Sequence, residues 1–305
     1  MPKAGPAGAE ELLPTVLAID SQPRPATEWL KVIILSEGWA SSPIQAAELA
    51  ARWEKPFLKR LRRAYGHLTE SGRVCQFSFN TSSDYVLQGA AFIEQGVDSA
   101  EVKEAKRRRA RLKAYVEMIT ELTPTEFEWL CRGILREMGA TCVCLTPATG
   151  DEGIDFYGRL PLQALLAAPP VFPSVWTQLE VWLVGQAKHY RMSQVATPEI
   201  RELVGSVTLA RARTFSEGDA DKYSGLSIKV CEPVYFLFFT TGLISADGWR
   251  LLQRSGVVGM DGMMVADFLA GRGIALDGSG CPGEAELIAW VRNHGPGRGS
   301  TGGDG

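Results

Sequence analysis

The hydrophobic pattern of the first ninety residues predicts a small helical domain that ends in a hairpin. Apolar positions at helical spacing indicate three short helices over 27–38, 41–53 and 55–68. Two segments of strand character, RVCQFSF and SDYVL, flank the polar tip 80–82 and predict a β-hairpin. Three helices followed by a hairpin are typical of a winged helix, so residues 1–88 are interpreted as a winged-helix-like domain.

The third predicted helix has an apolar face and a basic face. Its apolar positions recur at helical spacing and are Leu58, Leu61, Tyr65 and Leu68. Its flanking basic residues are Lys59, Arg60, Arg62 and Arg63. These cations form either a recognition surface for nucleic acid or a solvated face, and both interpretations stay open.

A charged segment of high helix propensity follows and is interpreted as a basic helical linker over 89–122. It holds the densest basic run in the chain, made of Lys106, Arg107, Arg108, Arg109 and Arg111. These cations could neutralise phosphates without reading bases. A solvated linker face is the alternative.

The segment TPTEFEWLCRGILREMG predicts a well-marked helix over 123–139. Thr123 is its N-cap, Pro124 occupies the first helical position and Glu126 stands at the capping-box position. Because Glu126 is used by the cap, Glu128 is the carboxylate left at the edge of the apolar stripe. Glu128 is therefore either a site residue or a solvated glutamate.

Three predicted strands follow this helix, over 140–146, 153–160 and 178–188. The third is nearly all apolar before its polar end, as expected for a central strand buried on both faces. Further helices and strands alternate downstream, at 197–213, 233–241, 245–254, 257–259 and 261–273. This order predicts an α/β domain with a mixed sheet, helices on both faces, and a site at strand ends.

The polar end of the third strand carries candidate chemistry. Gln186 and Lys188 are two residues apart on a strand, so their side chains share a face. Asp155 follows a glycine-containing turn and offers the ionised carboxylate that a hard divalent cation requires. A cation held by Asp155, by the Gln186 amide oxygen and by backbone carbonyls suits phosphodiester hydrolysis. Lys188 would then orient or deprotonate the attacking water, and Glu128 could hold a water molecule.

These motifs resemble the Mrr-like type IV restriction endonucleases, a QxK variant within the PD-(D/E)xK nuclease superfamily. The matching residues are Phe127 with Glu128, the DEGID turn at 151–155, and QAK at 186–188. Later segments PEIRELVG, FFTTG and GVVGMDG look like further family landmarks, so the resemblance covers Thr123 to Leu276. It implies a restriction-endonuclease-like fold over 123–276.

The resemblance also implies roles for individual residues. Asp155 and Gln186 would bind Mg²⁺, with Mn²⁺ as a substitute; Lys188 would be the catalytic lysine and Glu128 would assist. Two departures stand out. Glu152 occupies a position that is usually glycine in the family, and the segment 160–177 makes a long, proline-broken connection before the QxK strand.

Composition limits the possible domain number, thiol state and location of the protein but does not indicate a function. A chain of 305 residues with 45% hydrophobic residues is long enough for two domains, and a net charge of -3 argues against a protein coated with basic charge. The six cysteines predict reduced, buried thiols, and the three histidines lack ligand spacing. No apolar leader or membrane span is evident, so we expect a cytoplasmic protein without membrane contact. Residues 277–305 predict a last helix and a disordered, glycine-rich tail.

The combined expectation is a metal-dependent DNA endonuclease of prokaryotic restriction or anti-phage defence, acting on foreign or modified double-stranded DNA. Cuts on both strands favour a homodimer. The alternatives are a catalytically silent DNA-binding or regulatory protein, and a nuclease effector gated by a ligand or partner at the N-terminal domain. The expected nucleic-acid contacts are Lys59, Arg60, Arg62, Arg63, Arg107, Arg108, Arg109 and Arg201.

Overall fold

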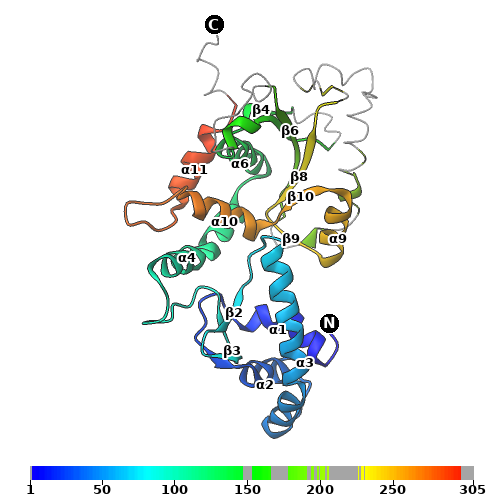
Figure 1. Cartoon of the computed structure of the whole chain (residues 1–305), viewed down its shortest axis with the longest axis vertical. Helices are drawn as coiled ribbons and strands as arrows, with labels where there is room; N and C mark the ends of the chain where they lie inside the picture. The colour runs from blue at the N-terminus through cyan, green and yellow to red at the C-terminus, as the bar shows by residue number, and fades with distance from the viewer. Residues whose placement is uncertain are drawn as a thin grey trace. The chain divides into compact units, whose positions relative to one another are not determined.

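The chain divides into two compact units. The computed structural model describes residues 2–146, 153–165, 178–190, 194–195, 198, 200–202, 205, 226, 228–229 and 231–296. By their contacts the units are Met1–Leu112 and Lys113–Gly305, both traced in Figure 1. The division falls inside the segment predicted as a linker. Helix α4 (Ala100–Ala110) belongs to the first unit and most of α5 (Leu112–Glu121) to the second.

The N-terminal unit packs helices against a small antiparallel sheet. Its helices are α1 (Pro6–Val16), α2 (Ala26–Ser36), α3 (Pro43–Glu70) and α4. Its strands are β1 (Arg24–Pro25), β2 (Phe77–Asn80) and β3 (Ser83–Gly89), in the order β1-β3-β2. The predicted hairpin is confirmed, because β2 and β3 pair on either side of the polar tip.

The helices of this unit differ from the prediction in two ways. The second and third predicted helices are one continuous helix, α3, with Pro56 inside it. Proline removes one backbone hydrogen bond, but Phe57, Leu58 and Leu61 are buried directly after it, and this apolar packing keeps the helix intact. Helix α1, which was not predicted, supplies buried Leu13 to the same core.

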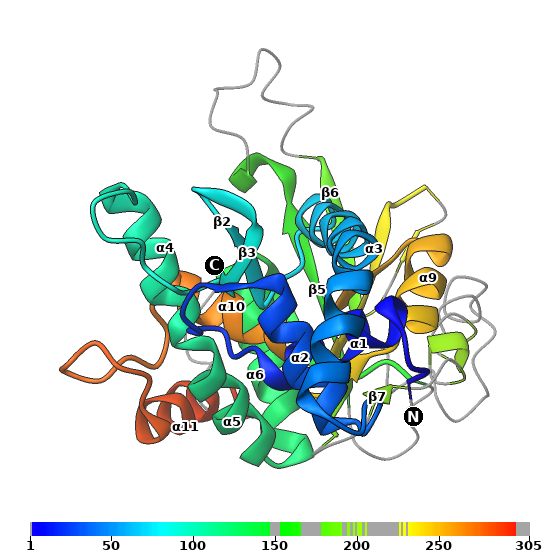
Figure 2. The ribbon, with the colours of Figure 1, turned by 90° about the horizontal axis from the view of Figure 1, so that it is seen from below.

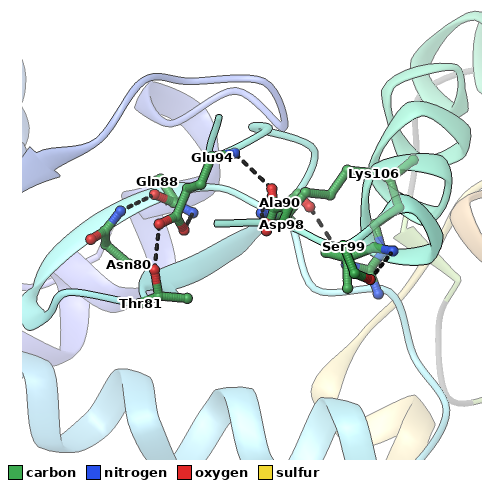
Figure 3. Close-up of polar contacts among 10 residues, drawn as sticks. Asn80, Thr81, Gln88, Ala90, Glu94, Asp98, Ser99 and Lys106 are labelled. Atoms are coloured by element: carbon green, nitrogen blue, oxygen red, sulfur yellow. Dashed lines mark hydrogen bonds and ion pairs between the residues drawn. The ribbon is translucent and has the colours of Figure 1, made fainter. Parts of the chain in front are cut away.

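A polar network joins the β2–β3 hairpin to α4 (Figure 3). Gln88, buried in β3, accepts a hydrogen bond from the Asn80 amide at 2.8 Å and donates one to the Glu94 carboxylate at 2.6 Å. The Glu94 backbone N–H donates to Asp98 at 2.6 Å. Lys106 in turn donates to both Asp98 oxygens, at 2.8 and 3.0 Å.

This network corrects the prediction for Lys106. Its side chain is only 10% exposed and that of Asp98 only 5%, so the ammonium is committed to a buried ion pair. Burial raises the pKa of Asp98, but the Lys106 and Glu94 hydrogen bonds and the Lys106 charge outweigh it and hold the pKa below its ordinary value. Lys106 is therefore a structural cation rather than one that faces phosphates.

A mixed five-stranded sheet forms the centre of the C-terminal unit, as predicted. The strand order is β10-β8-β6-β5-β4. Strands β6, β8 and β10 run parallel, whereas β5 is antiparallel to β6 and β4 is antiparallel to β5. The bounds are β4 (Thr141–Leu145), β5 (Phe156–Pro161), β6 (Glu180–Lys188), β8 (Val234–Thr240) and β10 (Val257–Met260). A short 3-10 helix η1 (Leu162–Leu165) follows β5, and β7 (Gln194–Val195) pairs with β9 (Leu243–Ile244).

Helices flank this sheet on both sides. Figures 1 and 2 show α6 (Pro124–Glu137) and α11 (Glu284–Asn293) on one side and α9 (Ala246–Ser255) on the other. The predicted capping box of α6 is present, with Thr123 and Glu126 exchanging hydrogen bonds. Asp261 caps α10 (Gly262–Arg272), as its position before a helical pattern predicted. Local caps thus start the helices that carry the predicted motifs.

The six cysteines are free, as expected, but only Cys131 is fully buried. Cys75 and Cys144 are half-buried, and the exposed ones are Cys142, Cys231 and Cys281. The prediction of buried thiols is therefore wrong for these three, which lie in an edge strand or in turns that no layer covers. Among the described helices, none combines the length and the apolar character that crossing a bilayer requires.

Candidate active site

Strand β6 brings the QAK residues to the end of the sheet. Residues Val181 to Val184 are buried, as the apolar pattern predicted for a central strand. Gln186 is 1% exposed and Lys188 is half-buried, and they lie opposite Phe238 and Thr240 of parallel strand β8. The polar end of β6 is therefore an inner position of the sheet and not a solvated edge.

Asp155 lies directly before β5 and against the end of β6. Its side chain is buried, and one carboxylate oxygen accepts the Ala187 N–H at 2.7 Å. Its own N–H donates to the Gly185 carbonyl at 2.9 Å, and its carbonyl accepts the Thr146 N–H at 3.0 Å. These bonds hold the carboxylate beside the backbone that joins Gln186 to Lys188. The structure thus brings together the three residues on which the predicted site depends.

Gln186 directly precedes Ala187, whose N–H the Asp155 carboxylate accepts, and its amide oxygen is unsatisfied. It is buried, and no donor in the described part of the chain hydrogen-bonds to it. A buried acceptor without a donor costs about 1–3 kcal/mol, whereas amide and carboxylate oxygens are the ligands that Mg²⁺ accepts. The residues present therefore fit a hard divalent cation held by Asp155 and Gln186.

A zinc centre fits less well. Over the described ranges, no group of three or more His, Cys, Asp or Glu side chains is placed to hold a metal ion. Zinc sites use such groups of nitrogen and sulfur ligands. The oxygen donors of Asp155 and Gln186, completed by backbone carbonyls or water, favour Mg²⁺ or Mn²⁺ instead.

Glu128 lies on α6, which packs on β4, β5 and β6. Cys131 lies one turn further along this helix and is fully buried. Burial raises the pKa of the Cys131 thiol well above its ordinary value, and the charges of Asp155 and Glu128 raise it further. Cys131 therefore stays protonated.

Residues that the prediction did not assign to the site fix the chain around Lys188. The Thr241 N–H donates to the Lys188 carbonyl at 3.3 Å. The Thr241 hydroxyl accepts the Tyr190 N–H at 2.8 Å and donates to the Tyr190 carbonyl at 2.9 Å. The His189 ring nitrogen Nε2 lies 3.1 Å from the Thr120 carbonyl. The sequence marks FFTTG only as a family-like segment. The fold shows that its second threonine, Thr241, holds the chain at the end of β6 through these hydrogen bonds, which we call the Thr241 clamp.

A cavity of about 970 Å³ lies next to this clamp. Its walls come from α5, the start of α10, and the segments around Tyr190, Thr241 and Leu243. Glu117, Glu121 and Glu284 are exposed residues of its lining. Since Thr241 and Tyr190 belong both to the cavity wall and to the clamp, an occupant of the cavity would touch the residues that hold Lys188.

The basic residues of α3 fall into two groups. Arg60 is paired with Glu10, and Arg62 lies 3.5 Å from Asp84. Lys59 and Arg63 are exposed, and no ion pair of theirs is recorded among the described residues. The predicted basic face therefore exists, with two of its four cations already engaged.

The other predicted contacts lie on different elements. In α4, Arg107 pairs with Glu104 at 3.3 Å, Arg109 donates to the Ala90 carbonyl at 3.5 Å, and the Nε atom of Arg108 is buried without an acceptor in the described part of the chain. Arg201 is an exposed helical residue of the second unit. The predicted positions outside the described residues are Asp151, Glu152 and 166–177 of the long connection.

Residues 119–215 match the family model of the Mrr catalytic domain, a restriction endonuclease. The Mrr resemblance is thereby confirmed for this stretch. It contains all four residues assigned to the predicted site, although it ends before Leu276, where the expected resemblance ended. No curated protein matches the chain. The Mrr-like stretch thus carries a restriction-endonuclease-like nuclease domain.

Solved restriction enzymes share a distant likeness with the chain. It is similar to MspJI restriction endonuclease in complex with a 27-mer oligonucleotide, with 20% identity over 68% of this chain and 40% of that chain and a TM-score of 0.35. It is similar to the DNA modification-dependent restriction endonuclease AspBHI with 15% identity over 66% of this chain and 44% of that chain and a TM-score of 0.37. It is similar to restriction endonuclease FokI bound to DNA with 12% identity over 87% of this chain and 44% of that chain and a TM-score of 0.35. The chain spans less than half of each of these proteins.

Proposed function

We propose that this protein is a Mg²⁺-dependent DNA endonuclease that hydrolyses phosphodiester bonds of foreign or modified DNA in prokaryotic restriction or anti-phage defence. The match of residues 119–215 to the Mrr catalytic domain supports nuclease chemistry. The observation that carries the metal dependence is the buried Gln186 oxygen without a donor, next to the buried Asp155 carboxylate.

The three central residues would divide the work of hydrolysis. Asp155 and Gln186 would hold the cation, which supplies positive charge to the scissile phosphate and to the attacking water. Lys188 shares the face of Gln186 and would orient that water, accept or relay its proton, and offset charge that develops on the phosphate. The water oxygen bonds to phosphorus as the bond to the 3′ oxygen breaks, and the 3′ oxygen takes a proton from solvent.

Glu128 has an auxiliary part in this proposal. Its helix, α6, packs on β5 and β6, the strands next to Asp155 and Gln186. A carboxylate there can accept a hydrogen bond from a water molecule and hold it near the cation. Glu128 would thus position a reactant without bonding to phosphorus.

The N-terminal unit would hold double-stranded DNA. Its element order α1-β1-α2-α3-β2-β3 supports the winged-helix-like interpretation, with α3 as the candidate recognition helix. The exposed cations Lys59 and Arg63 on α3 suit phosphate contacts. A homodimer of the nuclease would allow both strands to be cut, because duplex DNA has antiparallel strands related by twofold symmetry.

A gated nuclease is the second candidate, favoured by the 970 Å³ cavity. A ligand or partner segment in this cavity would contact Thr241 and Tyr190 and so bias the position of Lys188. This version predicts cleavage that appears only when the activator is present, whereas the ungated enzyme cuts unaided.

Cleavage of methylated and unmethylated plasmid DNA tests the proposal. Wild type and Lys229→Ala, which removes an exposed lysine of the same unit, should nick or linearise plasmid in Mg²⁺ or Mn²⁺ and not in EDTA. Lys188→Ala should cut about 10³-fold more slowly while binding the plasmid equally well. Equal cutting by Lys188→Ala would remove the assigned site, and DNA binding without cleavage by any form would favour the silent or gated protein.

A further inference from the structure

Helix α5 forms one wall of the 970 Å³ cavity, whose lining lies entirely in the second unit. One side of the helix is buried through Tyr115, Ile119 and Leu122. Four lining residues lie at positions i, i+3, i+4 and i+7, which share one face of a helix, and they are Ala114, Glu117, Met118 and Glu121. Since each helical residue adds about 1.5 Å, this face is about 10 Å long. The cavity therefore extends along two turns of α5, and we call it the α5 groove.

Apolar side chains form much of the α5 groove. They come from α5, β9, α10 and the segment before α11, and they are Val116, Met118, Leu243, Met263 and Pro282. Leu243 is 58% exposed, although β9 holds its backbone in a parallel pair with β7. Methionine side chains are flexible and adapt to apolar partners of different shape. An occupant that covers these side chains would remove apolar area from water, which favours association.

The charged residues of the α5 groove are all acidic. Glu117, Glu121 and Glu284 are exposed, and within the described chain the lining holds no lysine, arginine or histidine. Glu117 lies 3.9 Å from Lys113, whereas Glu121 and Glu284 form no ion pair with any described residue. Carboxylates repel phosphates and attract cations. The groove therefore disfavours DNA and complements a cationic occupant.

We propose that the α5 groove docks a basic amphipathic helix of a partner protein. Glu117 and Glu121 are four residues apart, which places them about 6 Å apart along the axis of α5. Lysine or arginine residues four apart on a second helix have the same spacing. The apolar face of that helix, with anchors at i, i+3 or i+4, and i+7, would cover Met118, Leu243 and Met263. The cavity volume is at the upper end of the range of about 300–1,000 Å³ for drug-sized ligands and exceeds what a small amine fills.

A docked helix would touch the Thr241 clamp. Tyr190 and Thr241 line the groove, and their hydrogen bonds fix the chain next to Lys188. Docking would thus restrain the end of β6, where Lys188 lies. The consequence for cleavage rests on the proposed function, whereas the docking itself does not.

A designed peptide tests the docking in the absence of DNA. The probe is a fluorescein-labelled amphipathic helix with leucines at i, i+3, i+4 and i+7 and lysines elsewhere, and the control peptide carries glutamate in place of lysine. Fluorescence anisotropy measures the binding of each peptide to the full chain, in EDTA and at fixed salt. Wild type should bind the lysine peptide about tenfold more tightly than the glutamate peptide. Equal binding of the two peptides, or binding of neither, would overturn the inference.

Three variants locate the bound peptide. Replacing Glu117 and Glu121 together by glutamine should weaken binding of the lysine peptide roughly fivefold, because two charge pairs are lost. Leu243→Ala, which shortens an exposed side chain, should weaken it about tenfold, because an apolar contact is lost. The matched control replaces Glu48 and Glu70, exposed residues of α3, by glutamine and should bind the peptide as wild type does.

Two results with these variants would contradict the proposal. Equal weakening by both double variants would mean that the net charge of the protein, and not the α5 groove, attracts the peptide. Self-association of the wild type that Leu243→Ala abolishes would assign the groove to a second copy of this chain. Since binding is measured without DNA or Mg²⁺, an absent nuclease activity would refute the proposed function and leave this inference standing.

Discussion

The two units place their functional polar groups in opposite surroundings. In the C-terminal unit, Asp155 and Gln186 are buried at the end of a five-stranded sheet, and the Gln186 oxygen is left without a donor in the described part of the chain. In the N-terminal unit, the cations on the basic face of α3, Lys59, Arg60, Arg62 and Arg63, are exposed. The C-terminal unit buries a few polar groups, which lowers its folding stability. The N-terminal unit exposes many charged groups, which costs little stability.

The difference follows from what each region is proposed to do. Holding a cation and a reactive phosphate requires fixed groups in a low dielectric, where an incomplete hydrogen-bond shell is exchanged for metal coordination. Holding a polyanion requires only a dense array of charges, and each contact is screened by salt. Substitutions in the first region should therefore change activity and stability in opposite directions, whereas those in the second should change affinity alone.

The largest expected effect comes from Gln186. Gln186→Leu should lower cleavage about 10³-fold. The same change should raise the unfolding free energy in EDTA by about 1 kcal/mol, because it removes a buried acceptor without a donor. Denaturant unfolding and plasmid cleavage measure the two quantities on the same preparations.

Gln186→Glu is the matched control for that change. It should retain Mg²⁺-dependent cleavage, because a carboxylate is also an oxygen ligand, but lose stability in EDTA, since it adds a buried charge near Asp155. A Gln186→Leu protein that is both less stable and fully active would show that this glutamine serves packing and not metal binding.

A smaller effect, confined to stability, is expected at the buried ion pair of the N-terminal unit. Lys106→Met should lower the unfolding free energy by about 3 kcal/mol, because it leaves the Asp98 carboxylate buried without its cation. Arg107→Met, in the exposed i,i+3 pair next to it, should change stability by less than about 1 kcal/mol. Chemical denaturation of both variants checks the contrast.

The pH dependence of this pair has a definite sign. The folded-state pKa of Asp98 is lowered from 3.8, so its contribution to stability is present above about pH 4 and is lost as the pH falls through the folded pKa. Wild type should therefore lose stability more steeply than Lys106→Met below pH 4. Parallel acid titrations would mean that the pair does not operate in solution.

The smallest effect is expected on the basic face of α3. Replacing Lys59 and Arg63 together by alanine should reduce the slope of log K against log salt by about 1.8, because two phosphate contacts are lost. Arg60→Ala should change the slope by less than about 0.9, since Arg60 is engaged with Glu10. Fluorescence anisotropy at several salt concentrations measures both slopes, and equal effects per residue would show that the ion pair does not restrain Arg60.

Local signals in the sequence accounted for much of the C-terminal unit. The N-caps Thr123 and Asp261 and the apolar run of β6 each specify an element through contacts within a few residues, and the structure contains all three. Local patterns failed in α3, which was predicted as two helices over 41–53 and 55–68 but is continuous through Pro56. There the burial of Phe57 and Leu58 by other elements outweighed the local preference.

Contacts between distant segments decided what the sequence left open. Lys106 looked like any other cation of its basic run until the fold placed Asp98 against it and buried both side chains. The sequence gives no role for Thr241. In the fold, the pairing of β8 with β6 brings the Thr241 hydroxyl within hydrogen-bond distance of the Tyr190 backbone.

The sequence by itself determined the elements of the nuclease domain, the mixed sheet and the candidate residues Asp155, Gln186, Lys188 and Glu128, because periodicity, caps and short motifs are properties of neighbouring residues. The tertiary structure alone decided which polar groups are buried and which cations are already paired. Burial and pairing depend on atoms far apart in the chain, and no local pattern contains their positions.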